Sequence, residues 1–322
     1  MRRDDLLNGR LWLVILVILL TSCDHATTND ERIRLGTNTW PGYAPLHLGS
    51  EIGATHSNRF ELVDLATTQE LLKGLLVGSL DGGGMTLQEL LNARDLGLDL
   101  IIVAVTNISN GADALISQPQ FSSIAELKGH KVGCDPTSLC ALMLKRAADQ
   151  AELSPDDFEI VPLTPIEHES AFGSRTVDAV ITFEPALTKL LELGGKRIFS
   201  SADIPNEIID VLVLRRSVIE AQPRIVDQLN ALWFDATQYF TDNPAASYTL
   251  MDKRLKIGSP ALRQAFKGLT IPSQSGAGML LQDQGAALQP SLLQVQSIML
   301  ELGEISAEGP VNTFFLPNAG QQ

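Results

Sequence analysis

One pattern occurs twice in this chain: IRLG (33–36) followed by FELVDL (60–65), and KVG (131–133) followed by FEIVPL (158–163). In each copy a short apolar strand leads through a polar loop to an apolar helix and then to a second strand. Phe60 and Phe158, which begin the second strand of each copy, lie 98 positions apart. A further helical stretch and another short strand follow, which is the order of an α/β unit with a helix-covered parallel sheet. The period is too long for a solenoid, so the sequence predicts two α/β lobes of similar plan.

The C-terminal part of the chain has a different pattern, with helical stretches at 218–240, 244–255, 260–266 and 290–302. Pro244, Pro260 and Pro290 stand where the first turn of a helix tolerates a missing N–H. Pro223 falls inside the first of these stretches, so we expect that helix to begin near Pro223. We expect a helical C-terminal layer that returns to pack on the first lobe.

Composition and charge exclude several classes of function. The 322 residues are 44% hydrophobic and 19% charged, which suits a folded protein with a sizeable core. The formal net charge of −14 argues against a nucleic-acid partner, whose phosphates demand a basic surface. No G-x-S-x-G, Walker A, G-x-G-x-x-G, H-E-x-x-H or C-x-x-C pattern occurs, and the five histidines show no ligand spacing. We therefore expect no enzyme activity, no metal site and no cofactor.

The N-terminus has the features of an export signal. Arginines within residues 1–10 precede LWLVILVILL (11–20), an apolar run too short for a bilayer-spanning helix, which needs roughly 20 residues. Leu20-Thr21-Ser22-Cys23 resembles a bacterial lipobox, in which cleavage precedes the Cys and its thiol is acylated. We predict a lipoprotein signal peptide at 1–22, lipidation of Cys23 and a polar tether at 23–30.

The predicted location follows from the same region. Asp24 resembles the inner-membrane retention signal of enteric bacteria. We therefore expect the lipid-anchored protein on the periplasmic side of the inner membrane, with the outer membrane as the alternative. Cys134 and Cys140 would there form a disulfide or stand as small buried apolar groups, and the sequence does not decide between these.

Four motifs occur in the order found in a known family: WPGYAPL (40–46), SIAELKGHKVG (123–133), VDAVITFEPA (177–186) and DVLV (210–213). Together they resemble the nitrate/sulfonate/taurine-type periplasmic binding proteins of ABC transporters. That group also includes binding proteins for thiamine-pyrimidine precursors. The resemblance covers most of residues 31–215 and is weaker beyond them.

This resemblance implies a two-lobe α/β periplasmic-binding-protein fold (type II), with two Rossmann-like lobes joined by a hinge of two chain crossings. We place the crossings near 111–115 and 209–214, lobe 1 at 31–110 plus 215–322, and lobe 2 at 111–214. The resemblance also implies that a small molecule is captured in the cleft between the lobes and delivered to an ABC permease. We expect the protein to act as a monomer.

The loops that follow the predicted strands hold the candidate site, because ligands of open α/β sheets lie beyond the carboxyl ends of the strands. Trp40 and Tyr43 would wall a ligand or stack on it, or else cap the core of lobe 1. Gly84 would let the backbone approach a ligand closely. Thr86 would contact the ligand, cap the next helix, or do both.

The second lobe and the crossings supply further candidates. Thr137 and Ser138 open a predicted helix whose free N–H groups favour a polar or anionic group, unless the two residues serve only as caps. Asn110 and Asp113 would make an interlobe hydrogen bond or contact the ligand. Glu184 stands where the resemblance implies a polar group in or near the cleft. These loops contain acidic residues but no Lys or Arg, which favours a neutral or cationic ligand, for example a heteroaromatic one, over an anion.

Two other functions stay open beside the leading hypothesis of a lipid-anchored solute-binding protein for an ABC importer. One is a periplasmic ligand-sensing module that signals to a membrane receptor. The other is an enzyme on the same fold. Enzymes of thiamine or menaquinone synthesis with this lobe architecture are cytoplasmic, which the export signal contradicts.

Overall fold

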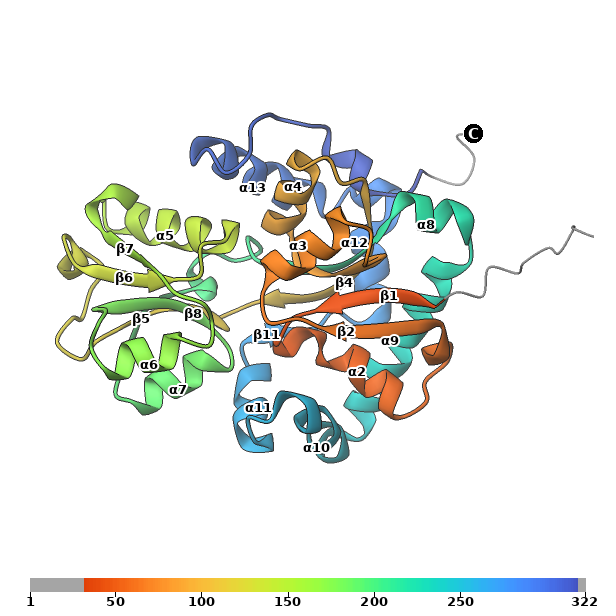
Figure 1. Cartoon of the computed structure of the whole chain (residues 1–322), viewed down its shortest axis with the longest axis horizontal. Helices are drawn as coiled ribbons and strands as arrows, with labels where there is room; N and C mark the ends of the chain where they lie inside the picture. Colours follow the sequence, from red (N-terminus) through yellow and green to blue (C-terminus); the bar gives the residue numbers. More distant parts are fainter. Residues whose placement is uncertain (1–31, 318–322) are drawn as a thin grey trace, which may run out of the picture. The chain divides into compact units, whose positions relative to one another are not determined.

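The computed structural model describes residues 32–317, which fall within one compact unit. The predicted signal peptide, the tether and Cys23 lie outside the described residues. Two β-sheets, each covered by helices, organise the fold (Figure 1). Over residues 32–317, no helix combines the length and the apolar character needed to cross a membrane.

The first sheet has six strands in the order β11-β4-β10-β3-β1-β2. Its strands are β1 (Ile33–Thr37), β2 (Phe60–Asp64), β3 (Gly82–Thr86), β4 (Leu100–Ser109), β10 (Ile209–Arg215) and β11 (Leu269–Thr270). The second sheet has five strands in the order β7-β6-β8-β5-β9. Its strands are β5 (Asp113–Ser117), β6 (Lys131–Cys134), β7 (Glu159–Pro162), β8 (Ala179–Phe183) and β9 (Lys196–Ser200).

The internal repeat of the sequence corresponds to a repeated unit in the two sheets. β1 pairs in parallel with β2 and β3, and β6 pairs in parallel with β7 and β8. The register is equivalent too, since Gly36 lies opposite Val63 in the first sheet and Gly133 lies opposite Val161 in the second. The two copies therefore form two similar parallel cores, and the predicted α/β fold class is confirmed.

The sheets are mixed, whereas the repeat predicted only parallel strands. β10 runs antiparallel between β3 and β4, and β5 runs antiparallel between β8 and β9. The chain enters each sheet from the other one along these two strands. They therefore run away from the junction of the sheets, while the parallel strands point toward it. A local sequence pattern does not show in which direction a strand runs through its sheet. The repeat therefore could not predict that β10 and β5 are antiparallel.

The chain passes between the sheets twice. β4 ends at Ser109 and β5 begins at Asp113, while β9 ends at Ser200 and β10 begins at Ile209. The crossings are therefore residues 110–112 and 201–208. The segment 209–214, predicted as the return crossing, is instead a strand, because its apolar run is buried between β3 and β4. The limits of the two lobes themselves stay a prediction.

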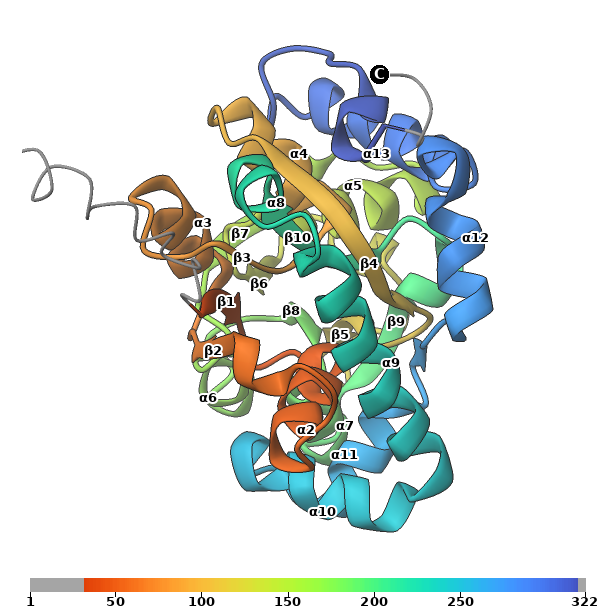
Figure 2. The same cartoon turned by 90° about the vertical axis from the view of Figure 1, so that its right-hand side faces the viewer.

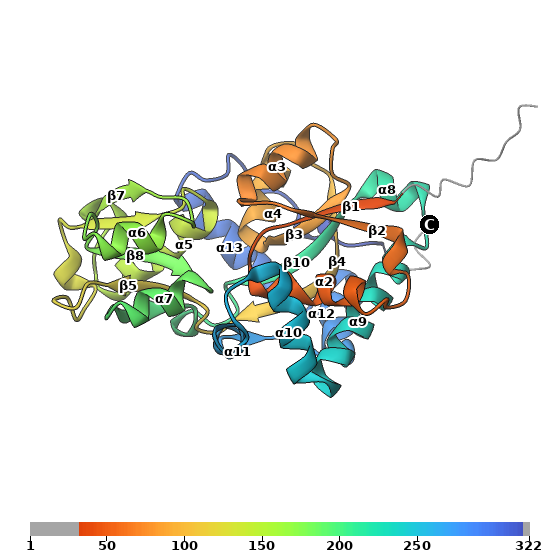
Figure 3. The same ribbon diagram turned by 60° about the horizontal axis from the view of Figure 1, so that its bottom comes forward.

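Helices cover both faces of each sheet (Figure 1, Figure 2). One face of the first sheet carries α3 (Thr68–Leu76), α4 (Leu87–Asp95), α12 (Gln274–Gly285) and α13 (Gln289–Glu301). Its other face carries α2 (Ala44–Glu51) and α9 (Ile225–Asp242). α10 (Pro244–Leu255) and α11 (Ser259–Phe266) extend this second layer (Figure 3).

The remaining helices complete these layers. The second sheet has α5 (Ser138–Gln150) on one face, and α6 (His168–Gly173) and α7 (Ala186–Glu192) on the other. α8 (Arg216–Ala221) directly follows β10. Short 3-10 helices lie at Pro41–Tyr43, Ser57–Arg59, Ala125–Leu127, Pro155–Asp157, Ser201–Asp203 and Val311–Phe314.

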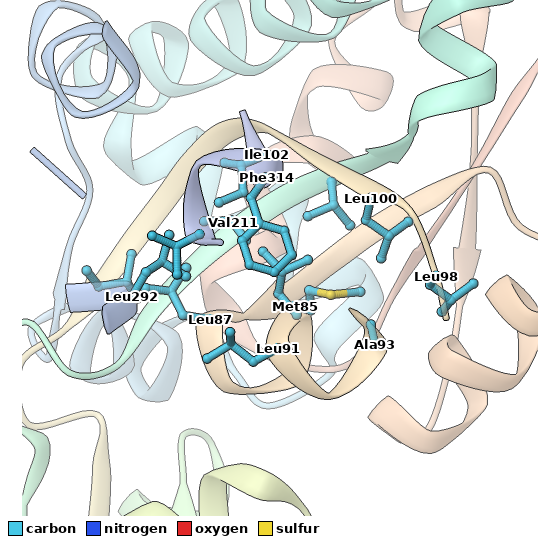
Figure 4. Packing of buried hydrophobic residues seen from close by; sticks show 14 of the residues in the cluster. Met85, Leu87, Leu91, Ala93, Leu98, Leu100, Ile102, Val211, Leu292 and Phe314 are labelled. Atoms are coloured by element: carbon cyan, nitrogen blue, oxygen red, sulfur yellow. The ribbon is translucent and has the colours of Figure 1, made fainter. Parts of the chain in front are cut away.

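Strand β10 shows how the first sheet binds both helical layers. Val211 and Val213 pack into the cluster formed with α4 and α13 (Figure 4), whereas Leu212 and Leu214 pack against α9 on the opposite face. This alternation follows from the two-residue period of a strand. On the α9 side the fully buried Trp233 anchors the contact. The predicted helical C-terminal layer therefore covers both faces of the first sheet.

Candidate ligand-binding site

A pocket opens at the junction of the two sheets. The space in it that no protein atom fills, counting the open mouth, is about 520 Å³. Its walls come from both sheets and comprise Asn38, Thr39, Trp40, Tyr43, Ala66, Thr67, Thr68, Thr86, Glu89, Asp113, Asp135, Thr137, Leu139, Pro165, Phe183, Ile208 and Asp210. Many of these residues lie at or shortly after the carboxyl ends of β1, β2, β3, β6 and β8. The pocket thus lies where open α/β sheets hold their ligands.

Tyr43 belongs to the innermost part of this pocket. It ends the 3-10 helix after β1 and is 1% exposed. Its hydroxyl donates a hydrogen bond to Oδ1 of Asp210. Gly84 of β3 faces the Tyr43 ring, and a Cβ on Gly84 would come within 2.6 Å of Cε1. Gly84 therefore makes room for Tyr43 and does not itself line the pocket.

Trp40 connects the two walls. Its Nε1 donates to Oδ1 of Asn107 at 3.3 Å, and its ring meets the ring of Phe183 edge to face, with 5.9 Å between the centroids. Phe183 ends β8 of the second sheet, so this contact joins the sheets. Gly42 is required beside Trp40, because a Cβ there would lie 2.2 Å from Nδ2 of Asn107.

Three buried carboxylates line the pocket: Glu89 of α4, Asp113 at the start of β5 and Asp210 in β10. Glu89 forms a capping box with Thr86, whose backbone N–H it accepts at 2.8 Å. Thr86 thus caps α4 and also lines the pocket. In contrast, Oδ2 of Asp113 and Oδ2 of Asp210 are buried and have no hydrogen-bond partner.

Burial raises the pKa of all three carboxyls. For Asp113, burial raises the pKa to about 7, opposed by the hydroxyl of Ser109 and helped by the negative charge of Glu89. Burial raises the pKa of Asp210 well above its usual range, against the effect of the hydrogen bond from Tyr43. Burial also raises the pKa of Glu89, although its capping hydrogen bonds oppose the shift. The acids of this pocket therefore hold their protons more tightly than acids in water.

The second sheet contributes the loop between β6 and α5. Thr137 lines the pocket and is the N-cap of α5, accepting from the backbone N–H of Cys140 at 3.5 Å. Cys134 and Cys140 are joined by a disulfide, which ties the end of β6 to the first turn of α5. Ser138 begins α5, but its side chain lies outside what the structure describes.

One side chain bridges the sheets next to the pocket. Gln69 of α3 donates from Nε2 to Oδ1 of Asp135 at 3.4 Å and to the carbonyl of Pro136 at 3.3 Å. Its neighbour Thr68 and Asp135 both line the pocket. These hydrogen bonds link the wall from the first sheet to the wall from the second.

Two predicted site residues lie away from the pocket lining. Asn110 is exposed in the outward crossing, and its backbone N–H donates to the carbonyl of Gly268 at 2.8 Å. Glu184 is buried and accepts from the backbone N–H and the hydroxyl of Thr188 at 3.2 and 2.8 Å. Its carboxylate is therefore engaged in the first turn of α7.

Sequence reasoning did not select Glu89, Asp210 or Phe183 for the site. Glu89 is the fourth residue of a T-x-x-E capping pattern at 86–89, which points to a helix start and not to a pocket. Asp210 is a single acid inside the apolar run IIDVLVL (208–214). An isolated acid in a buried strand needs a partner, so this pattern could have indicated a functional residue.

Two mixed α/β sheets with a pocket at their junction define a periplasmic-binding-protein fold. The chain matches the NMT1-like family over residues 26–251 and belongs to that family. A protein of Escherichia coli (strain K12) named as an aliphatic sulfonates-binding protein is 24% identical over 263 residues, covering 79% of this chain and 81% of that protein. The resemblance inferred from the four sequence motifs is confirmed.

Solved structures share this fold. The periplasmic aliphatic sulphonate binding protein SsuA from Escherichia coli superimposes with a TM-score of 0.72 at 20% identity, covering 88% of this chain and 97% of that one. A desulfurization enzyme, DSZB, superimposes with a TM-score of 0.63 at 16% identity, covering 89% and 97%. The fold alone therefore does not decide between binding and catalysis.

Proposed function

We propose that this chain is the solute-binding protein of an ABC importer, which captures a small molecule between its two sheets and delivers it to a membrane permease. The observation that carries this proposal is a pocket whose walls come from both sheets. Closure of two walls around a ligand buries it and creates a distinct surface for the membrane partner. Membership in the NMT1-like family and the similarity to an aliphatic sulfonates-binding protein support the proposal.

The proposal includes a hinge between two lobes, each built on one sheet, with lobe 2 at 111–208 because β10 (Ile209–Arg215) belongs to the first sheet. The two crossings, residues 110–112 and 201–208, would absorb the rotation. The bonds from Gln69 to the β6–α5 loop would form on closure and break on opening. Because Gln69 is exposed, these bonds cost little to break, which suits a reversible latch.

We propose five of the predicted residues as ligand contacts: Trp40, Tyr43, Thr86, Asp113 and Thr137. All five line the pocket. The described residues that line it include four carboxylates and no Lys or Arg. This lining supports a neutral or cationic ligand, which differs from the anion named for the Escherichia coli relative.

The location of the protein is a further part of the proposal. A lipid on Cys23 would hold it on the periplasmic side of the inner membrane, within reach of the permease. The Cys134–Cys140 disulfide supports an exported protein, because disulfides persist in oxidising compartments and are rare in the cytosol.

A binding protein releases its ligand unchanged, whereas an enzyme of the same fold converts it. The test is a thermal-shift screen of amines, heteroaromatic compounds, sulfonates and nitrate, followed by mass spectrometry of each compound that binds. We expect one class to bind at one molecule per chain and to be recovered intact. Recovery of a converted product would replace the receptor with an enzyme, and a screen in which no class binds would contradict both.

A further inference from the structure

We infer that the pocket takes an organic cation with N–H donors, a primary ammonium or an amidinium group, held between the free oxygens of Asp113 and Asp210. This inference names the ligand class of the proposed solute-binding site and rests on that proposed function. It goes beyond a preference for neutral or cationic ligands, because it assigns the two atoms that bind the charge and the chemistry that they require.

The first observation is the pair of unpartnered oxygens. Asp113 is 3% exposed and Asp210 is 2% exposed, and both side chains line the pocket. Oδ1 of Asp210 accepts from Tyr43, but Oδ2 of each Asp has no partner. Buried polar atoms in folded proteins are almost always paired, so these two acceptors call for a donor that arrives with a ligand.

The second observation is the uncompensated charge. Glu89 and Asp135 join Asp113 and Asp210 in the described lining, and no cationic side chain stands among them. Carboxylates buried together disfavour one another's ionised form, and an entering cation reverses this effect. An anion would meet charges of its own sign at this wall and be repelled.

The N-terminus of α5 is the feature of the opposite wall that favours an anion. Thr137 already accepts one of its backbone N–H groups, and the acidic side chain of Asp135 lies in the loop just before it. The N-terminus of α5 should therefore attract a negative group less strongly than Asp113 and Asp210 attract a positive one.

The third observation concerns the hydrogen-bond donors that the cation must carry. Trp40 and Phe183 provide aromatic surface at the pocket, which any cation could use. A quaternary ammonium has no N–H and would leave both oxygens unpaired, whereas an amidinium or a primary ammonium presents two or more donors. A metal ion is not favoured either, since residues 32–317 contain no group of three or more His, Cys, Asp or Glu with metal-binding geometry.

Proton release gives this binding a distinct signature. Burial raises the pKa of Asp113 to about 7, and a bound cation would lower it, so protons would leave as the ligand enters. The titratable groups that surround Asp113 belong to several elements: Tyr43 after β1, Glu89 of α4, Asp135 after β6, His168 of α6, Glu184 after β8 and Asp210 of β10. Burial lowers the pKa of His168 to about 4, so this imidazole stays neutral and does not compete with the cation.

The experiment is isothermal titration of the mature protein with matched probes that share one ring. Benzylamine and benzamidine carry N–H cations, benzyltrimethylammonium carries a cation without N–H, and benzenesulfonate and benzyl alcohol are the anionic and neutral members. Aliphatic and heteroaromatic amines extend the set. We expect the N–H cations to bind at least about tenfold more tightly than the other three probes. Their binding enthalpy should depend on the buffer, because protons are released.

Variants locate the effect. Asp113→Asn and Asp210→Asn should each weaken binding of the N–H cations by at least about tenfold and reduce proton release, while the control Asp227→Asn, an exposed acid in the first turn of α9, should change neither. Circular dichroism checks that the variants fold. Tighter binding of benzenesulfonate or benzyl alcohol overturns the cation inference but leaves the solute-binding proposal standing. Binding of no member of the set overturns the inference as well, and the broader screen then decides the proposed function.

Discussion

Asp113 and Asp210 carry buried oxygens without partners, so they lower the stability of the folded protein while they prepare the pocket for a ligand. Such a conflict between stability and function is expected where a site must attract a group that the protein lacks. Glu89 differs from these two acids, because Thr86 already satisfies part of its carboxylate. The three acids therefore have separate roles, although they share one wall of the pocket.

The contribution of Asp113 to the stability of the ligand-free protein should become less favourable as the pH rises from about 4 to about 7. The folded-state pKa of Asp113 is about 7, whereas an Asp in an unfolded chain ionises near pH 3.9. Between these values the folded state binds more protons, so raising the pH favours unfolding, and the effect levels off above pH 7. Melting temperatures of the wild type and Asp113→Asn, measured from pH 5 to pH 8, check this.

The stability of Asp113→Asn relative to the wild type should increase from pH 5 to pH 7, and Asp227→Asn should follow the wild type. The comparison with the wild type isolates Asp113, because Asp210 and Glu89, whose pKa burial raises, act in the same direction in both proteins, while His47 and His168, whose pKa burial lowers, act in the opposite direction. Equal slopes for the wild type and Asp113→Asn would contradict the assigned environment of Asp113.

Trp40→Ala should weaken ligand binding by about 2 kcal/mol, or roughly thirtyfold, because it removes a buried aromatic wall and its contact with Phe183. Trp40→Phe should lose less, since it keeps a flat ring and forfeits the hydrogen bond to Asn107. Calorimetric titration with the tightest ligand of the screen measures both variants. An unchanged affinity of Trp40→Ala would remove this residue from the site.

At the level of single residues, the sequence led to pocket-lining side chains near strand ends, and their role as ligand contacts stays a proposal. Trp40, Thr86 and Thr137 lie at or shortly after the ends of β1, β3 and β6 and line the pocket, because strand ends of parallel sheets meet at one edge. Asp210 was missed because it lies near the start of an antiparallel strand. The start of that strand, and not its end, lies at the edge of the sheet that holds the pocket. Glu184 was placed near the pocket by position alone, and its bonds to Thr188 depend on a local turn that spacing does not reveal.

At the scale of elements, the loop between β6 and α5 is the most constrained part of the second wall. The disulfide closes it at both ends, Thr137 caps the helix that follows, and Gln69 contacts it from the first sheet. Each of these contacts restricts the loop that carries two pocket residues. Preorganisation of this kind reduces the entropy that binding must overcome.

Replacing both Cys134 and Cys140 by Ser should lower the free energy of unfolding by about 2 kcal/mol, since the disulfide closes a short loop in the unfolded chain. Ligand affinity should also fall, because the loop with Asp135 and Thr137 loses its fixed ends. Urea unfolding followed by calorimetric titration measures the two effects. Unchanged stability and affinity would show that the crosslink contributes to neither the fold nor the site.

Prediction at this scale was strong for helices and weaker for strand direction. The prolines at 244, 260 and 290 lie at the first or second position of α10, α11 and α13, as their missing N–H requires. The return crossing was placed near 209–214 from the family resemblance, which gives only an approximate position, and this segment is strand β10. The antiparallel pairing of β10 and β5 depends on the path of the whole chain.

At the scale of the whole molecule, the repeat and the four motifs were enough to predict the fold class and the family, since both depend on ordered patterns along the sequence. The identity of the ligand was not, because the pocket is assembled from residues far apart in the chain. Asp113 and Asp210, for example, are brought together only by the two crossings. The lipid anchor concerns residues outside the described part of the chain and stays a proposal.

Cys23→Ser should abolish acylation, leaving an unlipidated protein that is either soluble or still held by its signal segment. The reason is that the Cys thiol is the nucleophile to which the lipid is attached. Metabolic labelling with a radioactive fatty acid, followed by membrane fractionation, measures both properties. Normal labelling of Cys23→Ser would reject the predicted lipobox.

The central claim, that the two sheets close around one small molecule, is tested most directly by a distance measured between them. Spin labels at Lys73→Cys in α3 and Ile166→Cys before α6, both exposed positions, report the separation of the two walls. Saturating ligand, with binding established by calorimetry, should shift the distances to a single shorter and narrower distribution. A distribution that is the same with and without bound ligand would contradict capture by closure of the two sheets.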